Sequence, residues 1–298
     1  MNNKTNKVVV FGGSGFIGSH TADELSNRGY NVVIYDCLIS KYLKKNQKFV
    51  HGNLSDNFLI EKTLYDAEYV YYFAGIADIE ESKKNPNKTI EVNILGLNNV
   101  LNEISKINLN RFVYASTMYV YSSYGSFYRA SKQCAEIIIK TYCEEFNFDY
   151  TFLRYGSLYG SRAQEWNGLK KYIQEIINEK KIDYIGTGTE RREYIHAIDA
   201  SKISVDVLND SFKNTAITVT GQQILTSEVL INMIFEITGI KKNINFIEKE
   251  KKSDHYNITP YRYIPENSMK IVPDRFIDIG EGILEIVKKI YSENIKMS

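Results

Sequence analysis

A glycine-rich turn between an apolar run and an amphipathic segment is the feature that most limits how this chain can fold. Residues 8–11 read Val-Val-Val-Phe without polar alternation, which indicates a strand buried on both faces of a parallel sheet. Gly13, Gly15 and Gly18 then satisfy G-x-G-x-x-G, and Gly12 begins a second spacing, G-x-x-G-x-x-G. Such a turn lets a pyrophosphate approach bare backbone at a helix N-terminus. The stretch predicts a dinucleotide-binding strand, turn and helix.

An acidic residue follows at the distance that such a unit requires. We expect a helix from Phe16 to Arg28 and then a strand over residues 31–36, which ends in Asp36, 18 residues after Gly18. A carboxylate there accepts hydrogen bonds from an adenosine ribose and repels a 2′-phosphate. Because no arginine follows Asp36 directly, the pattern favours NAD over NADP.

The composition of the chain argues against nucleic acid and membranes as binding partners. The 298 residues carry 37 basic and 36 acidic side chains, a formal net charge of +1, so no global field favours nucleic acid or an anionic membrane. No apolar run approaches the ~20 residues needed to span a bilayer. We therefore expect a cytoplasmic protein that binds neither nucleic acid nor membrane. The 3 cysteines and 4 histidines share no metal-ligand spacing, and we expect no disulfide framework and no metal.

The pattern of apolar runs continues the alternation of strands and helices. We expect a short strand at the start of residues 48–56 and strands over 68–75 and 111–117, with Asp56 capping the helix that follows the first of them. Pro86 can begin a long helix whose apolar face is interrupted by Asn93, either as a surface position or for a specific role. This order predicts an α/β fold with a doubly wound, Rossmann-type parallel sheet.

A tyrosine and a lysine four residues apart, Tyr128 and Lys132, begin a strong helix that runs toward Phe146. The spacing places both side chains on one helical face. A phenol has an ordinary pKa near ~10, so a neighbouring ammonium is needed before it can take a proton at neutral pH. Thr117, at the end of the preceding strand, can bond the same substrate oxygen. The three residues predict proton removal from an alcohol while hydride leaves its carbon.

At this point the sequence resembles a known family, the extended short-chain dehydrogenase/reductases that act on nucleotide sugars, the group of the NAD-dependent epimerases and dehydratases. The resemblance covers almost the whole chain. Besides the glycine turn and the Tyr128/Lys132 pair, it includes residues 73–75 (Phe-Ala-Gly), 92–101 around Asn93, 117–121, 153–162 and 186–199.

The resemblance implies roles for individual residues. NAD would contact Gly12, Gly15, Phe16, Ile17, Gly18, Asp36, Asn53, Leu54, Phe73, Ala74, Gly75, Asn93, Tyr128 and Lys132. A GDP-, UDP- or dTDP-linked sugar would contact Thr117, Ser157 and Arg192, where Arg192 binds the diphosphate in preference to its neighbour Arg191. The catalytic residues would be Thr117, Tyr128 and Lys132. The family also suggests a homodimer or higher homo-oligomer through the helices at 86–107 and 127–146.

Two domains are expected, an NAD-binding domain over residues 1–155 and a mainly nucleotide-sugar-binding lobe over 156–298, with some segments returning to the first. Helices at 166–178, 227–237 and 281–291 and strands at 182–185 and 216–219 would form this smaller α/β lobe. Asp199 is expected to cap or anchor the helix that follows it. Residues 248–252 form a mixed charge run that is typical of a solvated loop.

The sequence departs from the family pattern at positions that bear on the reaction. Ten residues separate Thr117 from Tyr128, fewer than is usual, so part of the sugar-facing wall is missing or supplied elsewhere. Ser157 replaces a usual Asn, Asn53 a usual Asp, and residues 269–273 a usual Leu-Gly-Pro stretch. Met118 and Tyr119 stand where 4,6-dehydratases carry an Asp-Glu pair, which disfavours dehydration.

We therefore expect NAD-dependent oxidation of a sugar hydroxyl, at C4, by an epimerase. A dehydrogenase or ketosugar reductase that releases its product is the alternative. A 4,6-dehydratase, a non-catalytic nucleotide-binding protein and an oxidoreductase for a non-nucleotide alcohol are further alternatives.

Overall fold

The computed structural model describes residues 6–247, 268–271 and 275–297. Within these ranges, parallel strands form one large sheet of 8 strands in the order β13-β10-β6-β5-β4-β1-β2-β3. Their bounds are β1 (Lys7–Phe11), β2 (Asn31–Asp36), β3 (Lys48–His51), β4 (Tyr69–Tyr72), β5 (Arg111–Thr117), β6 (Tyr150–Tyr155), β10 (Thr215–Val219) and β13 (Ser268–Lys270). The apolar runs are central strands because both of their faces are covered.

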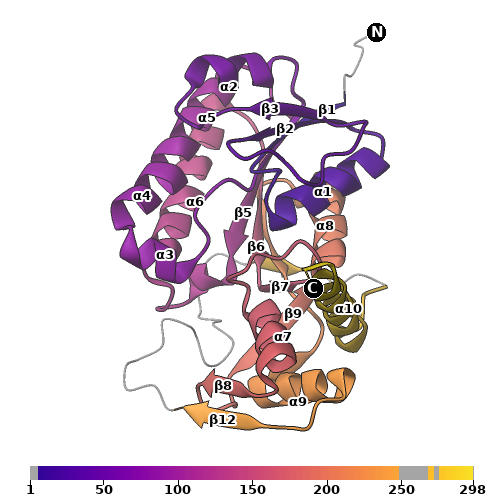
Figure 1. Ribbon diagram of the computed structural model, residues 1–298. Helices are drawn as coiled ribbons and strands as arrows, with labels where there is room; N and C mark the ends of the chain where they lie inside the picture. The colour runs from indigo at the N-terminus through magenta and orange to yellow at the C-terminus, as the bar shows by residue number, and fades with distance from the viewer. Residues whose placement is uncertain (1–5, 248–267, 272–274, 298) are drawn as a thin grey trace.

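Helices cover both faces of this sheet (Figure 1). On one face, α1 (Phe16–Asn27) packs against α8 (Ala197–Asp206), and Leu25 and Ile203 enter a shared apolar core. On the other face, a second core holds residues of α2 (Asn57–Leu64), α5 (Gly96–Ile104) and α6 (Ser126–Phe146). The predicted doubly wound α/β fold is confirmed.

The chain reverses direction across the sheet between β1 and β4. From β1 it proceeds through β2 to β3 at one edge, and it then returns to β4 on the other side of β1 and continues to β5 and β6. Connections that leave a parallel sheet in opposite directions open a crevice at the carboxyl ends of the two strands. The glycine turn after β1 and the small residues after β4 meet at this crevice.

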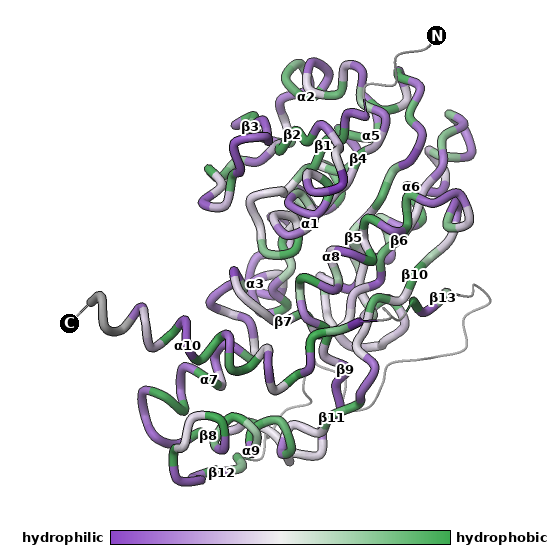
Figure 2. The backbone as a smooth tube through the Cα atoms, turned by 90° about the vertical axis from the view of Figure 1, so that its right-hand side faces the viewer, coloured by the Kyte–Doolittle hydropathy of each residue, from purple (hydrophilic) through white to green (hydrophobic). Residues whose placement is uncertain are grey.

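A smaller lobe lies at the opposite end of the molecule from α2 and β3 (Figures 1 and 2). It holds a three-stranded sheet in the order β11-β9-β7 and a two-stranded sheet of β8 and β12. Hydrophobic and hydrophilic residues alternate along α10 in Figure 2, and α10 packs its apolar residues against α7 and α9. The bounds are β7 (Ser157–Tyr159), β8 (Ile182–Ile185), β9 (Arg191–His196), β11 (Ile224–Thr226), β12 (Ile244–Ile247), α7 (Gly168–Glu179), α9 (Ser227–Thr238) and α10 (Ile279–Met297).

One prediction about the C-terminal half is wrong, and another is wrong in one of its two alternatives. The strand expected at 216–219 belongs to the large sheet as β10, where it pairs with β6. Asp199 does not cap α8, because the side chain of His196 accepts the backbone N–H of Ile198 at the N-cap position. Asp199 is buried in the first turn of α8 and accepts the backbone N–H of Ile277 at 2.7 Å, which joins the segment before α10 to α8. The charge run at 248–252 lies outside the described residues, as do residues 272–273 of the 269–273 stretch.

The helix expected from Pro86 is interrupted. It begins as α4 (Pro86–Ile90), passes through one π-helical segment (Glu91–Leu95) and continues as α5. A π-helical turn inserts an extra residue into the helical repeat, so it changes which side chains face the protein interior. Asn93 lies in this segment and is only 2% exposed, which rules out the surface position that the sequence left open.

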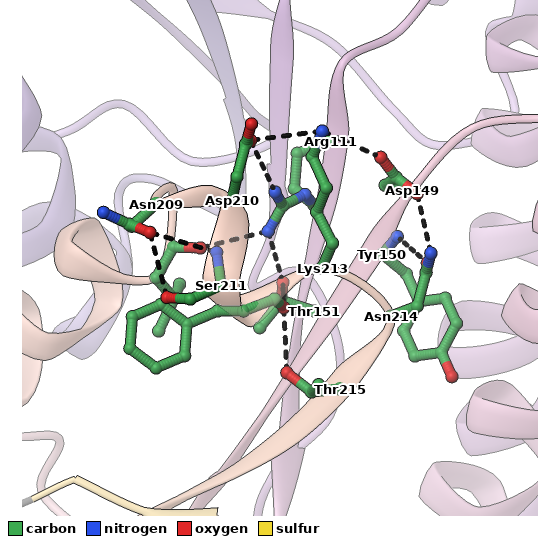
Figure 3. Close-up of polar contacts among 12 residues, drawn as sticks. Arg111, Asp149, Tyr150, Thr151, Asn209, Asp210, Ser211, Lys213, Asn214 and Thr215 are labelled. Atoms are coloured by element: carbon green, nitrogen blue, oxygen red, sulfur yellow. Dashed lines mark hydrogen bonds and ion pairs between the residues drawn. The ribbon is translucent and has the colours of Figure 1, made fainter.

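A buried arginine fastens the N-terminal ends of the central strands (Figure 3). The Arg111 side chain at the start of β5 is 1% exposed, and its Nη1 donates to Thr151 Oγ1 at 2.9 Å and to the Val207 carbonyl at 3.1 Å. Its Nη2 lies 3.7 Å from Asp210 Oδ1. Arg111 thereby joins β5, β6 and the segment that leads from α8 into β10. It lies at the sheet edge away from the crevice, so its role is in stability.

Replacing Arg111 with methionine should lower the free energy of unfolding by about 2–4 kcal/mol, because the Val207 carbonyl loses its buried donor. Lys213→Met is the matched control, since this half-exposed lysine pairs with Asp149 and Asp210 at the rim of the same cluster. Its effect should stay within about 0.5 kcal/mol. Urea unfolding of both variants measures the difference, and equal losses would contradict this role for Arg111.

Candidate active site

The glycine turn has a backbone shape that larger residues cannot adopt. Gly12 has φ +78°, and a Cβ added there would lie 2.4 Å from the backbone nitrogen of Ala74 after β4. A Cβ on Gly18 would lie 2.3 Å from the Gly12 carbonyl oxygen. The turn leads into α1, whose N-cap, Gly15, makes no side-chain cap bond and whose first turn holds no acidic residue. The N–H groups of that turn are therefore suited to an anionic ligand, as the bare backbone of a pyrophosphate site requires.

Asp36 lies at the end of β2 beside this turn. Its Oδ2 accepts the Ser14 backbone N–H at 2.9 Å, and its Oδ1 accepts the Leu38 N–H at 2.9 Å. These bonds fix the carboxylate where β1 and β2 open, and each oxygen keeps a lone pair for a further donor. The arrangement is compatible with the predicted ribose contact.

One cavity of about 1670 Å³ extends from the glycine turn into the smaller lobe. This volume exceeds the roughly 300–1,000 Å³ of a pocket for a single drug-sized ligand, so there is room for a dinucleotide and a second molecule. Its wall includes these predicted residues: Gly12, Gly15, Phe16, Ile17, Gly18, Asp36, Asn53, Leu54, Phe73, Ala74, Gly75, Thr117, Tyr128, Lys132, Ser157 and Arg192. The structure thus brings together the predicted cofactor, catalytic and substrate residues, with the exception of Asn93.

Asn93 is a positioning residue rather than part of the cavity wall. Its Oδ1 accepts the Ile76 N–H at 2.7 Å, and its Nδ2 donates to the Ile76 carbonyl at 3.0 Å and to Ser131 Oγ at 2.9 Å. The amide therefore ties the loop after Gly75 to the helix that carries Lys132. The prediction of a direct cofactor contact finds no support in this placement.

The predicted catalytic residues meet where β5 ends and α6 begins. Tyr128 and Lys132 occupy the first two turns of α6, and Thr117 is the last residue of β5. The Thr117 hydroxyl lies beside the Tyr128 phenol and accepts the Tyr119 N–H at 3.3 Å. Lys132 Nζ donates to the Ala115 carbonyl at 2.7 Å and lies 5.9 Å from the centroid of the Tyr128 ring. A hydroxyl, a phenol and an ammonium therefore converge at one point of the cavity.

Burial sets the ionisation of this group. It raises the pKa of Tyr128 to about 12, against the hydrogen bond from Thr117, which lowers it. Burial lowers the pKa of Lys132 to about 8, against the carboxylate of Glu136, which raises it. Tyr128 is thus a neutral phenol at pH 7 in the protein alone, and Lys132 is a cation that loses its proton only slightly above neutrality.

Tyr119 completes the wall that the short segment between Thr117 and Tyr128 would otherwise leave open. That segment folds as a 3₁₀ turn, Met118–Tyr121, and then reaches Gly125 in a left-handed conformation at the N-cap of α6. The Tyr119 ring lines the cavity and meets the Tyr128 ring edge-on, with centroids 6.2 Å apart. Sequence reasoning considered Tyr119 only as lacking acid or base chemistry and missed this role.

The side chains of Arg191 and Arg192 point to opposite faces of their strand, as those of adjacent strand residues do. They stand on β9, where successive side chains point to opposite faces, and Arg192 lines the cavity whereas Arg191 is exposed. Ser157 on β7 also lines the cavity, and so does the half-exposed Trp166 before α7, which the sequence did not single out.

Comparison with known proteins identifies the family. Residues 8–219, more than two thirds of the chain, match the model of the NAD dependent epimerase/dehydratase family. The chain belongs to this family. The resemblance expected from the sequence is confirmed, and NAD is the family's cofactor. Within the described ranges, no cluster of three or more His, Cys, Asp or Glu side chains could hold a metal ion, and no helix is long and apolar enough to cross a membrane.

Individual relatives in the NAD dependent epimerase/dehydratase family differ in how much of their length they share with this chain. A putative UDP-glucose 4-epimerase of Methanocaldococcus jannaschii is 29% identical, over 96% of this chain and 99% of that protein. A dTDP-D-glucose 4,6-dehydratase of Dictyostelium discoideum is also 29% identical, but over 67% of this chain and 55% of its own length. The solved UDP-glucose 4-epimerase of Thermotoga maritima shares the fold, with a TM-score of 0.84 and 22% identity over 97% of this chain and 99% of that one.

Proposed function

We propose that this protein is an NAD-dependent 4-epimerase of a UDP-sugar, in which Thr117, Tyr128 and Lys132 are the catalytic residues. The observation that carries the proposal is the single cavity, in which these three side chains lie between the glycine turn and Arg192. A redox cofactor and a diphosphate-linked substrate can therefore reach the same three groups at once. The full-length match to a relative named as a UDP-glucose 4-epimerase supports the choice of reaction and of nucleotide.

The chemistry assigns a separate task to each residue. Tyr128 first loses its own proton to solvent, and the Lys132 ammonium stabilises the phenolate that forms. The phenolate oxygen then takes the proton of the C4 hydroxyl, whose oxygen Thr117 holds. NAD, held by the glycine turn and Asp36, would supply the acceptor and later the donor of the C4 hydride. The nicotinamide cation would also counter the burial that keeps Tyr128 protonated. Tyr128 then gives its proton back to the C4 oxygen, so protons and electrons balance over the cycle.

The dehydratase alternative lacks its acid and base. Removal of water needs groups that move protons at two further sugar carbons, and Met118 and Tyr119 follow Thr117 instead of an acidic pair. Release of the keto product, as by a dehydrogenase or a reductase, requires no further residue and is therefore an outcome of the test.

The test is a panel of UDP-, GDP- and dTDP-sugars incubated with the purified protein and NAD, followed by NADH absorbance and mass spectrometry. We expect a UDP-sugar product of unchanged mass and altered chromatography, without net NADH. Stoichiometric NADH with a product lighter by two hydrogens would instead identify a dehydrogenase. A product lighter by one water would identify a dehydratase, and an absence of turnover with retained NAD binding would identify a binding protein.

Arg192→Ala should raise the KM for the nucleotide sugar by about 10–100-fold with little change in kcat, because charged hydrogen bonds to a diphosphate are worth about 1.5–3 kcal/mol. Arg191→Ala is the matched control, since the neighbouring side chain faces solvent, and its KM should stay within about twofold. Steady-state kinetics measures both variants. A larger effect of Arg191→Ala would exclude Arg192 as the diphosphate ligand.

Three expectations stay predictions. They are the domain boundary at residue 155, the cytoplasmic location, and the homo-oligomer through the helices at 86–107 and 127–146. Exposed apolar side chains on these helices, such as Leu95 and Ile137, agree with the last of them.

A further inference from the structure

A buried ion pair lies directly behind the predicted catalytic residues. The Glu136 carboxylate on α6 accepts three hydrogen bonds, from Ser116 Oγ at 2.6 Å and from Arg154 Nε and Nη2 at 3.0 and 2.6 Å. Both Glu136 and Arg154 are buried, and neither lines the cavity. Because a hydrophobic replacement of a buried ion pair often leaves a protein equally stable or more stable, stability alone does not explain this pair.

The same pair joins the elements that carry the predicted catalytic residues. Ser116 immediately precedes Thr117 on β5, and Arg154 on β6 donates through Nη1 to the Tyr121 hydroxyl at 2.6 Å. Tyr121 ends the 3₁₀ turn that begins after Thr117, and its ring lies 4.8 Å from the Arg154 guanidinium. The network therefore fixes the end of β5 and the 3₁₀ turn against α6.

Glu136 also supplies a negative charge near Lys132. It follows Lys132 by one helical turn, as Lys132 follows Tyr128. Among the described residues, no ion pair reaches the Lys132 ammonium, whose polar contact is the Ala115 carbonyl. The other titratable groups packed around Lys132 are Tyr128 on α6, Tyr114 on β5 at 4.7 Å, and behind them Tyr121 and Arg154.

We propose that the Glu136–Arg154 pair is a positioning unit, whose carboxylate keeps Lys132 protonated for its task and whose hydrogen bonds hold Thr117 in register with α6. The effect of this pair on catalysis rests on the proposed function, whereas its effect on the charge of Lys132 does not. Burial alone works against the ammonium, and Glu136 opposes that effect through its negative charge.

The experiment follows Lys132 directly by NMR titration of side-chain ¹⁵N-labelled lysine in the protein without cofactor, with Lys132→Met to assign the signal. We expect Lys132 to titrate at about 8 in the unaltered protein. In Glu136→Gln the pKa should fall by about one unit or more, because the carboxylate is lost and the Arg154 cation is left uncompensated. Glu144→Gln, an exposed position of the same helix, is the matched control and should leave the titration unchanged.

A double variant, Glu136→Gln with Arg154→Met, separates charge from packing. It removes the uncompensated cation, so the pKa of Lys132 should recover part of the fall seen in Glu136→Gln alone, and it keeps the test available if the single variant does not fold. An unchanged pKa of Lys132 in Glu136→Gln would overturn the proposal. A pKa of Lys132 that is lower in the double variant than in Glu136→Gln would also overturn it.

The pH profile of turnover adds the catalytic consequence. Lys132 must be charged, so activity should fall as the pH rises through its pKa, and in Glu136→Gln this alkaline limb should move to lower pH. If the pKa of Lys132 falls in Glu136→Gln as expected but the unaltered protein turns over no substrate, the proposed function is contradicted and the positioning role is left intact. Turnover with an alkaline limb that stays in place in Glu136→Gln would overturn the positioning role alone.

Discussion

Replacing Tyr128 with phenylalanine should lower kcat by about 10²–10⁴-fold, the contribution typical of a positioned acid–base group. The substitution removes the oxygen that takes the C4 proton and keeps the ring that packs near Lys132 and Tyr119. NAD affinity should therefore stay within a few-fold of the unaltered protein. Steady-state kinetics with the best substrate of the panel, together with calorimetric titration of NAD, measures the two quantities separately.

Tyr124→Phe is the matched control for this prediction. It removes the same atom from the same stretch of chain, at an exposed position outside the cavity wall. Its kcat should match that of the unaltered protein. If Tyr128→Phe kept more than about a tenth of the activity, another group would have to take the proton, and the assignment of Tyr128 would fail.

Gly18→Ala should weaken NAD binding by about 100-fold or more. The added methyl group would lie 2.3 Å from the Gly12 carbonyl oxygen, so the turn and the first turn of α1 must move apart. A displacement of about 1 Å in a positioned active site lowers the reaction rate by about 10²-fold. We expect the affinity for NAD to fall by a similar factor. Calorimetric titration of NAD, with a thermal melt to show that the variant is folded, measures the effect.

Gly15→Ala provides the comparison within the same turn. Gly15 has φ −74°, and its added Cβ would approach the Gly12 oxygen only to 3.3 Å, so the backbone can keep its path. Its loss of affinity should be clearly smaller than that of Gly18→Ala. Equal losses in folded variants, or NAD binding by Gly18→Ala at the original affinity, would contradict a role of close packing between turn and helix.

The sequence predicted elements whose signals are local. The strands at 31–36, 111–117 and 182–185 have the bounds expected from their apolar runs, and the Asp56 cap accepts the Leu59 N–H as its position suggests. The wall of the cavity was largely predictable too, because the carboxyl ends of neighbouring parallel strands meet at one edge.

Features that depend on distant pairing or on side-chain direction were not predictable. The apolar run at 216–219 identifies a strand, but only tertiary contact decides that it extends the large sheet beside β6. Asp199 fits an N-cap pattern, yet His196 takes that position because the helix begins earlier than expected. The π-helical turn that brings Asn93 inward has no sequence signature that distinguishes it from ordinary helix, so its contact with Ile76 could not be foreseen.

The most direct test of the proposed reaction is the fate of a deuterium label at C4 of the UDP-sugar that the panel identifies as substrate. If the hydride leaves C4 and returns from the other face within one binding event, the inverted product keeps the label at C4, and no deuterium reaches the solvent or free NADH. NMR of the product reads the label and the configuration together. Inversion with loss of the label to water would contradict hydride transfer, and a ketosugar accompanied by free labelled NADH would show a dehydrogenase instead of an epimerase.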